Sequence, residues 1–151
     1  MKNLLLILTL IILSSCSEIT GEEIARLPIN AISTEDNLVV KEVALDLKSG
    51  DEIGIWSDMD MAYDGDVELR FRIGVLKNGE DYTTMEIDPT VKNITLGEFK
   101  SSINGQTKWS YTGKNKGLKI DEDATYIFKG IFVSSENPSL VITKAEVVLK
   151  K

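Results

Sequence analysis

Apolar and polar residues alternate with a period of two along most of the chain from residue 38 onward, a pattern typical of β-strands. The clearest example is Val67 to Val75, in which five apolar residues alternate with polar residues or glycine. Such a segment is expected to bury one face and expose the other. Two segments near the C-terminus, 126–133 and 141–150, are apolar on both faces and are predicted to be central strands. Shorter alternating segments lie at 43–47, 53–55, 85–87, 109–112 and 118–120.

Turn signals separate these segments at intervals of about 8–14 residues, among them Ser49-Gly50-Asp51 and Asn104-Gly105. A short helical turn is the one helical element expected, around 96–103. The pattern predicts an all-β fold, a single antiparallel β-sandwich of eight or nine strands. Jelly-roll and immunoglobulin-like topologies both fit, and a closed barrel is the alternative.

The N-terminal segment differs from the rest of the chain. Lys2 is followed by a run from Leu4 to Leu13 that only Thr9 interrupts. Ten helical residues span about 15 Å, half of a hydrocarbon core of about 30 Å. The segment is therefore predicted to be a signal peptide and not a membrane-spanning anchor.

The hydrophobic run ends in Leu13-Ser14-Ser15-Cys16, which resembles the lipobox of bacterial lipoproteins. The resemblance implies cleavage before Cys16, a diacylglycerol thioether on its sulfur and acylation of its new amine. Several acyl chains anchor a protein stably, whereas a single chain binds reversibly. In lipoprotein sorting, a serine such as Ser17 after the cysteine resembles an outer-membrane rather than an inner-membrane signal. The periplasmic or surface face is left open.

The expected organisation is a signal peptide over 1–15, an acylated cysteine with a flexible acidic tether over 16–27, and a β-sandwich domain over 28–151. Processing would remove one lysine from a chain of net charge −7 and leave 136 residues of net charge −8. An acidic domain of this kind is not expected to bind nucleic acid.

Composition also limits the chemistry. The sequence has no histidine and one cysteine, which removes Ser-His and Cys-His nucleophile pairs and histidine-bearing zinc sites. No nucleophile elbow or phosphate-binding glycine loop is present. We therefore expect a binding protein with no cofactor and no catalytic residues.

The densest polar feature is an acidic stretch over 51–66, expected to be an exposed loop between strands. Its aspartates Asp58, Asp60, Asp64 and Asp66 are a candidate calcium site, because calcium takes six to eight oxygen ligands. The spacing departs from that of an EF-hand loop. A polar surface loop without a metal is the favoured interpretation.

Two further segments are candidate contact sites. The sequence Gly113-Lys114-Asn115-Lys116-Gly117 predicts a mobile hairpin tip, in which Lys114 and Lys116 would meet lipid headgroups or an acidic partner. Trp56 is out of phase with Ile53 and Ile55, so it is expected at a sheet surface, where its ring would stack on a sugar.

These observations favour a lipid-anchored envelope protein that acts as a non-catalytic binding or accessory module for another envelope protein, met through an exposed strand edge or the acidic stretch. Two alternatives remain open. One is an immunity-type inhibitor, because a strongly acidic domain can neutralise a basic toxin by electrostatic complementarity. The other is a carbohydrate-binding or calcium-dependent ligand-binding module.

Overall fold

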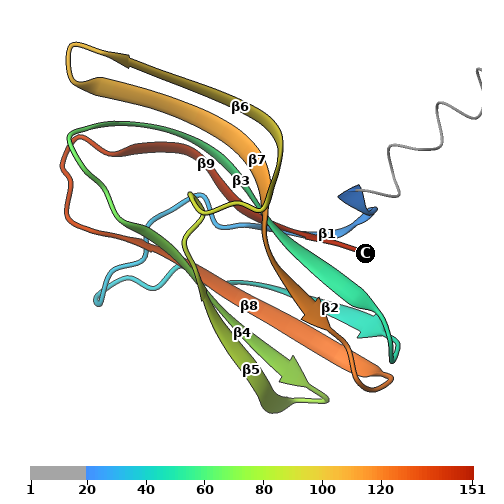
Figure 1. Cartoon of the computed structure of the whole chain (residues 1–151). Helices are drawn as coiled ribbons and strands as arrows, with labels where there is room; N and C mark the ends of the chain where they lie inside the picture. The colour runs from blue at the N-terminus through green and yellow to red at the C-terminus, as the bar shows by residue number, and fades with distance from the viewer. Residues whose placement is uncertain (1–19) are drawn as a thin grey trace, which may run out of the picture.

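The computed structural model describes residues 20–151, which form two antiparallel β-sheets packed face to face (Figure 1). The predicted β-sandwich of eight or nine strands is confirmed, with nine strands in the described part. No helix within residues 20–151 is both long and apolar enough to cross a membrane. The strands are β1 (Glu23–Pro28), β2 (Lys41–Leu47), β3 (Glu52–Asp64), β4 (Leu69–Lys77), β5 (Glu80–Ile87), β6 (Ile94–Ile103), β7 (Gln106–Lys119), β8 (Ala124–Ser134) and β9 (Val141–Lys150).

The strand order identifies the topology as a jelly roll. One sheet has the order β1-β9-β3-β7-β6 and the other β2-β8-β4-β5. If β6 is set aside, the remaining strands form nested antiparallel pairs: β1 with β9, β2 with β8, β3 with β7 and β4 with β5. The chain is thus folded back on itself between β4 and β5, as in a jelly roll. Strand β6 is an addition that extends the first sheet beyond β7.

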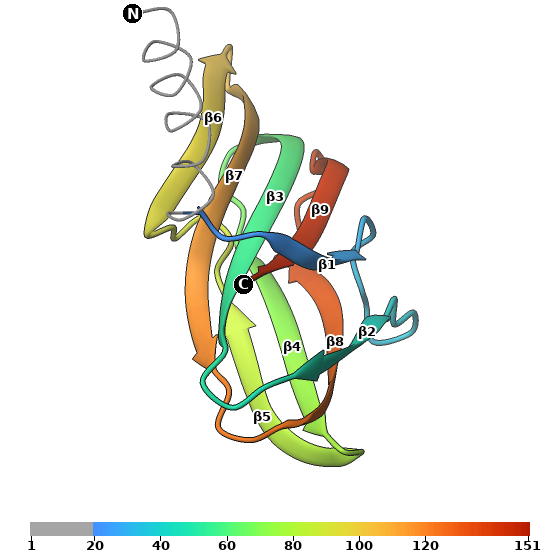
Figure 2. The same ribbon diagram turned by 90° about the vertical axis from the view of Figure 1, so that its right-hand side faces the viewer.

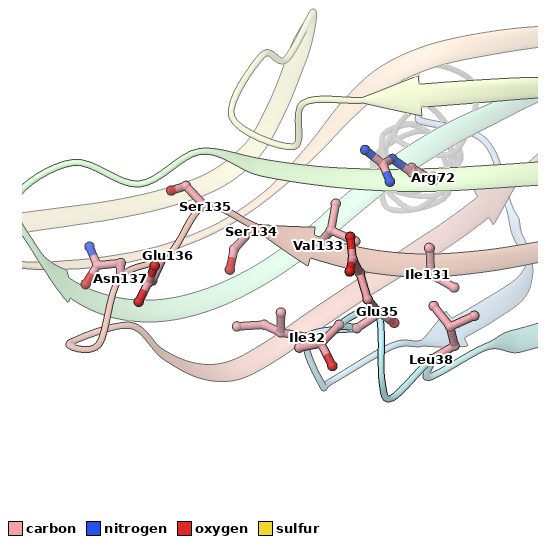
Figure 3. Close-up of a pocket in the computed structure, with 12 residues that line it drawn as sticks. Ile32, Glu35, Leu38, Arg72, Ile131, Val133, Ser134, Ser135, Glu136 and Asn137 are labelled. Atoms are coloured by element: carbon pink, nitrogen blue, oxygen red, sulfur yellow. The ribbon is translucent and has the colours of Figure 1, made fainter.

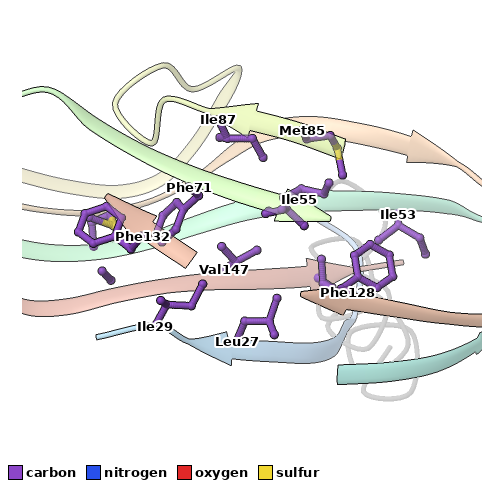
Figure 4. Packing of buried hydrophobic residues seen from close by; sticks show 14 of the residues in the cluster. Leu27, Ile29, Ile53, Ile55, Phe71, Met85, Ile87, Phe128, Phe132 and Val147 are labelled. Atoms are coloured by element: carbon purple, nitrogen blue, oxygen red, sulfur yellow. The ribbon is translucent and has the colours of Figure 1, made fainter. Parts of the chain in front are cut away.

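The two inner faces enclose one hydrophobic core (Figure 4). Side chains from both sheets interdigitate there, including Leu27, Ile55, Phe71 and Val147. Phe71 and Phe132 come from neighbouring strands of the second sheet, and their ring centroids are 4.8 Å apart. The segments predicted to be central, β8 and β9, each lie between two neighbouring strands of their sheet.

Two hairpins close on two-residue turns. Asn104 and Gly105 join β6 to β7 with φ values of 52° and 86°, and Asn78 and Gly79 join β4 to β5 with 51° and 87°. Positive φ at both central residues defines the type I′ turn, which asparagine and glycine adopt most easily. The turn predicted at Asn104-Gly105 is therefore confirmed.

The tether ends earlier than predicted. Residues 23–27, the last part of the predicted tether, belong to β1, and Leu27 packs fully buried in the core. The backbone N–H of Glu22 donates to the Lys151 carbonyl at 2.8 Å, and Lys151 N–H donates back to Glu22 at 2.9 Å. The ordered body therefore begins by residue 22, and both ends of the described chain lie together.

Three other local predictions were wrong. The acidic stretch is not a loop: most of it belongs to β3, where Met59, Met61 and Tyr63 face the core and Asp58 and Asp60 face out. The glycine-bounded segment 113–117 is not a hairpin tip but the middle of β7. Residues 96–103 form part of β6 instead of a helical turn, because they carry no apolar stripe with a helical period.

Candidate functional site

Among residues 20–151, strand β6 forms one border of the five-stranded sheet and pairs only with β7 (Figures 1 and 2). It is ten residues long, and most of its residues are exposed. Three large apolar side chains on it are open to solvent: Leu96 at 48%, Phe99 at 63% and Ile103 at 69%. A long exposed edge with apolar side chains is the arrangement that soluble proteins usually avoid, because it invites pairing with another strand.

The turn geometry shows which backbone groups of β6 are free. In the type I′ turn, the carbonyl of Ile103 accepts from the N–H of Gln106, so these two residues form a hydrogen-bonded pair. Hydrogen-bonded and non-hydrogen-bonded pairs alternate along antiparallel strands. Phe99 and Ser101 therefore direct their N–H and C=O groups toward β7. Glu98, Lys100 and Ser102 direct theirs toward the open edge.

A buried lysine holds this hairpin in place from beneath. Lys92 lies in the connection before β6, and its side chain is only 7% exposed. Its Nζ is 2.9 Å from Oε1 of Glu98 and 3.8 Å from the ring centroid of Tyr111. Trp109 Nε1 donates to the same Glu98 oxygen at 2.6 Å. An ammonium group over aromatic faces, paired with a carboxylate, is a strong anchor for an otherwise exposed hairpin.

The contacts and burial in this cluster shift the pKa values of Glu98 and Tyr111. Hydrogen bonds from Lys92 and then from Trp109 lower the pKa of Glu98 below its ordinary value of 4.5. Burial raises the pKa of Tyr111 far above its ordinary value of 10.0, with Asp88 and Glu98 adding to the effect. Gly113 makes room for the lysine, since a Cβ there would lie 2.5 Å from Lys92 Cδ.

On its outer face the hairpin borders a hollow of about 480 Å³. Phe99 lines one side, Ser110 and Thr112 of β7 line the floor, and Asp58 and Lys144 lie across from them. A second hollow of about 500 Å³ continues along the same face near the turn, between Ile103 and Asp64. Both are open depressions bordered by β6 and are suited to contact with another protein surface.

The other sheet carries a hollow of about 470 Å³ on its outer side (Figure 3). The connection between β1 and β2 supplies Ile32 and Leu38, and β8 supplies Ile131 and Val133. Its polar border includes Glu35, Arg72, Ser134, Ser135, Glu136 and Asn137. It contains no aromatic ring, so it offers no stacking platform for a sugar.

The aspartates of the candidate calcium site do not converge. Asp58 and Asp60 lie on the outer face of β3, Asp64 ends that strand, and Asp66 lies in the connection to β4. Within residues 20–151 no group of three or more histidine, cysteine or acidic side chains is arranged to hold a metal ion.

Positive side chains surround Asp58 instead. Arg26 Nη1 lies 2.9 Å from Asp58 Oδ2, and Lys144 Nζ lies 3.4 Å from Oδ1. Arg26 also forms hydrogen bonds with Glu23 and Glu146. The bond to Glu23 contributes most to raising the pKa of Arg26, and the bond to Glu146 adds to it. The cations that neutralise Asp58 are thus supplied by β1 and β9 of the same sheet.

Trp56 is on the outer face of its strand, as its phase predicted, but it is not exposed. Only 1% of its surface is accessible, because Lys150 lies across the ring with Nζ 4.5 Å from the centroid. Gly54 packs against the indole edge, where a Cβ would come within 2.9 Å of Nε1. The predicted exposed stacking surface is therefore absent at Trp56. Lys114 lies on β7 beside it, and Lys116 lies two residues farther along.

Alternation alone did not reveal β6, although its residues are strand-like. A register shift between Thr95 and Gly97 breaks the period near the start of the strand. The signal that could have located it is the pair of asparagine-glycine turns, one of which requires a strand directly before Asn104. The predicted lipidation residue, Cys16, lies outside the described residues.

No family model matches this chain, and no curated protein matches it in sequence.

Proposed function

We propose that this chain is a lipid-anchored protein of the bacterial cell envelope, held at the outer membrane through Cys16, whose β-sandwich is a non-catalytic binding module for another envelope protein. The observation that carries the binding proposal is the free edge of β6, with Leu96, Phe99 and Ile103 exposed on it. Such an edge accepts a strand from a partner by main-chain hydrogen bonding, while side chains next to it give specificity.

The rigidity of the hairpin supports this proposal. An edge that docks a partner strand loses less conformational entropy on binding if it is already ordered. The ion pair between Lys92 and Glu98 and the lysine–aromatic contacts order β6 in the free protein. Catalysis finds no comparable support, because the side chains around β6 form ion pairs and aromatic contacts instead of an acid–base or nucleophile pair.

The small number of residues between Cys16 and the β-sandwich is consistent with the proposed membrane anchor. Five residue steps from Cys16 to Gly21 reach at most about 18 Å. An acylated Cys16 would hold β1 near the membrane surface. In the five-stranded sheet, β6 is four strands away from β1, which corresponds to about 19 Å at about 4.8 Å per strand. The free edge is therefore on the border of the sheet opposite the anchored strand.

Metabolic labelling with a fatty-acid analogue tests the anchor. The full-length protein is expected to incorporate label and to sediment with the outer membrane. Cys16→Ser is expected to lose both properties, while the neighbouring change Ser14→Ala keeps them. Label retained by Cys16→Ser would contradict lipid anchoring.

The edge is tested by removing one donor. Lys100→Pro deletes an N–H that points to the open edge, and a proline there leaves the hydrogen bonds to β7 in place. Lys100→Arg keeps both that N–H and the positive charge and is the matched control. After mild crosslinking of intact cells, Lys100→Pro should lose the adducts that the wild type and Lys100→Arg form. Equal adducts from all three, with unchanged melting temperatures, would contradict strand addition at β6.

A further inference from the structure

We infer that the strand that docks on β6 is the β6 of a second copy of this chain, so that two sandwiches join their five-stranded sheets across a two-fold axis at Phe99. This inference rests on the proposed function, because it identifies the partner of the same edge. The argument comes from the register that the free backbone groups of β6 allow and from the side chains that this register brings together.

The free backbone groups determine which residues of the two β6 strands can lie opposite each other. The residues with free N–H and C=O groups are even-numbered: Glu98, Lys100 and Ser102. Two antiparallel copies satisfy these groups only if even residues face even residues. A two-fold axis at Phe99 meets this condition, because it places Glu98 opposite Lys100 of the second copy and Lys100 opposite Glu98.

Charge complementarity selects this register. Glu98 uses only Oε1 for its contacts with Lys92 and Trp109, and Oε2 accepts no hydrogen bond within the described chain. Lys100 lies over the Trp109 ring at 3.8 Å, and residues 20–151 give it no ion-pair partner. The two-fold axis forms the Glu98–Lys100 pair twice. Sliding one copy of β6 by two residues would break both ion pairs. Sliding it by one residue would place the free N–H and C=O groups of one copy opposite residues whose groups already bond to β7.

The apolar side chains agree with the same register. Phe99 would meet Phe99 of the second copy in a non-hydrogen-bonded pair, where opposed side chains come closest. Each ring is 63% exposed in the single chain and would be covered in the pair. The contact is isologous, so it closes at two copies and leaves no further edge of this kind. Anchoring both copies in one membrane would raise their effective concentration.

Cysteine crosslinking on the full-length lipidated protein in isolated membranes tests the register. Phe99→Cys is expected to form a disulfide-linked species of twice the mass on mild oxidation, because the two residues 99 face each other at about 4.5 Å between Cα atoms. Ile103→Cys is the matched control. It is equally exposed but would face Thr95 of the second copy, so it should not crosslink to itself. Equal crosslinking of the two variants, or none for Phe99→Cys, would overturn the inference.

A charge reversal tests the ion pairs separately. Lys100→Glu places like charges opposite each other twice and should weaken dimerisation about tenfold or more. Lys108→Glu makes the same charge change on β7 and should leave the dimer intact. A dimer that persists unchanged in Lys100→Glu would contradict the proposed register.

A photoreactive phenylalanine analogue at position 99 in cells separates failure of the inference from failure of the proposed function. An adduct of twice the monomer mass supports self-pairing. An adduct with a different envelope protein overturns self-pairing but supports the proposed function. The absence of any adduct would contradict both.

Discussion

The hydroxyl of Ser57, buried in the middle of β3, donates a hydrogen bond of 2.6 Å to Oδ1 of Asn115. Asn115 is the extra residue at a bulge in β7, and its Nδ2 donates to the carbonyl of Val91 at 2.8 Å and to that of Pro89 at 3.2 Å. One amide thus ties the connection between β5 and β6 to the centre of the first sheet. The position of Lys92, and through it the position of β6, depends on this contact.

Asn115→Ala is therefore expected to lower the free energy of unfolding by about 2 kcal/mol, because it leaves a buried hydroxyl and several carbonyls without their partner. Urea unfolding measures the change. Asn93→Ala is the control, since Asn93 makes one long side-chain bond of 3.4 Å and should cost no more than about 0.5 kcal/mol. Equal effects of the two substitutions would contradict the role given to Asn115.

Lys92→Met keeps most of the aliphatic side chain but removes the charge next to Glu98 and Tyr111. We expect a loss of about 1–2 kcal/mol of stability. Amide hydrogens of β6 and β7 should exchange faster than those of β8. Lys108→Met removes a charge from an exposed position of the same hairpin and should change neither quantity. Uniformly faster exchange in both sheets would show that Lys92 supports the whole fold instead of the hairpin.

Acid should weaken the same cluster. Because the pKa of Glu98 is lower in the folded chain than its ordinary 4.5, its contribution to stability is present above pH 4.5 and is lost as the pH falls through the folded value. Glu98→Gln should flatten the fall in stability below pH 4.5, as measured by urea unfolding at several pH values. Glu80→Gln, at an exposed position at the start of β5, should leave the slope unchanged. An unchanged slope in Glu98→Gln would contradict the assignment.

Calcium at millimolar concentration is not expected to change the melting temperature. Arg26 and Lys144 already neutralise Asp58, and the other aspartates of the stretch do not converge on it. Magnesium is the control for ionic strength. A rise in melting temperature with calcium alone, lost in Asp60→Asn, would show that the aspartates bind the ion in spite of their spacing along β3.

The two tryptophans should differ in their exposure to quenchers. Trp109→Phe leaves Trp56 as the single tryptophan, and its fluorescence should be nearly insensitive to iodide, because the ring is buried under Lys150. Trp56→Phe leaves the partly exposed Trp109, which should be quenched more strongly. Strong quenching of Trp56 would reopen the interpretation that its ring stacks on a ligand.

The alternation of apolar and polar residues predicted the fold class and the central strands, because burial of a strand face directly produces this alternation. The segment from Val67 to Val75 matches β4 closely, and the two-sided segments became β8 and β9. Periodicity failed where polar residues occupy a strand for tertiary reasons. Asp58 and Asp60 lie on the outer face of β3, where Arg26 and Lys144 pair with Asp58. In β7, a glycine stands at position 113 because the side chain of Lys92 occupies the space beside it.

The edge strand was missed for a related reason. Few side chains of β6 are buried, so burial imposes no alternation on its sequence. Its structure depends on pairing with β7 and on Lys92, which is a contact between segments that no local pattern reveals. Trp56 was placed on the correct face of its strand, but the side chain that covers it, Lys150, lies almost a hundred residues away in sequence.

The nested pairing of the strands has a consequence for the order of folding. The hairpin of β4 and β5 needs only a two-residue turn, whereas Glu23 of β1 must find Lys150 near the end of the chain. Pairing between such distant residues carries a high loop-closure cost and slows folding. A chain that emerges from a translocation pore N-terminus first therefore cannot complete β1 until its last strand has arrived. The first strand of the sandwich, which lies nearest to the proposed anchor, is then the last to close, and until it does the edge of β9 is unpaired.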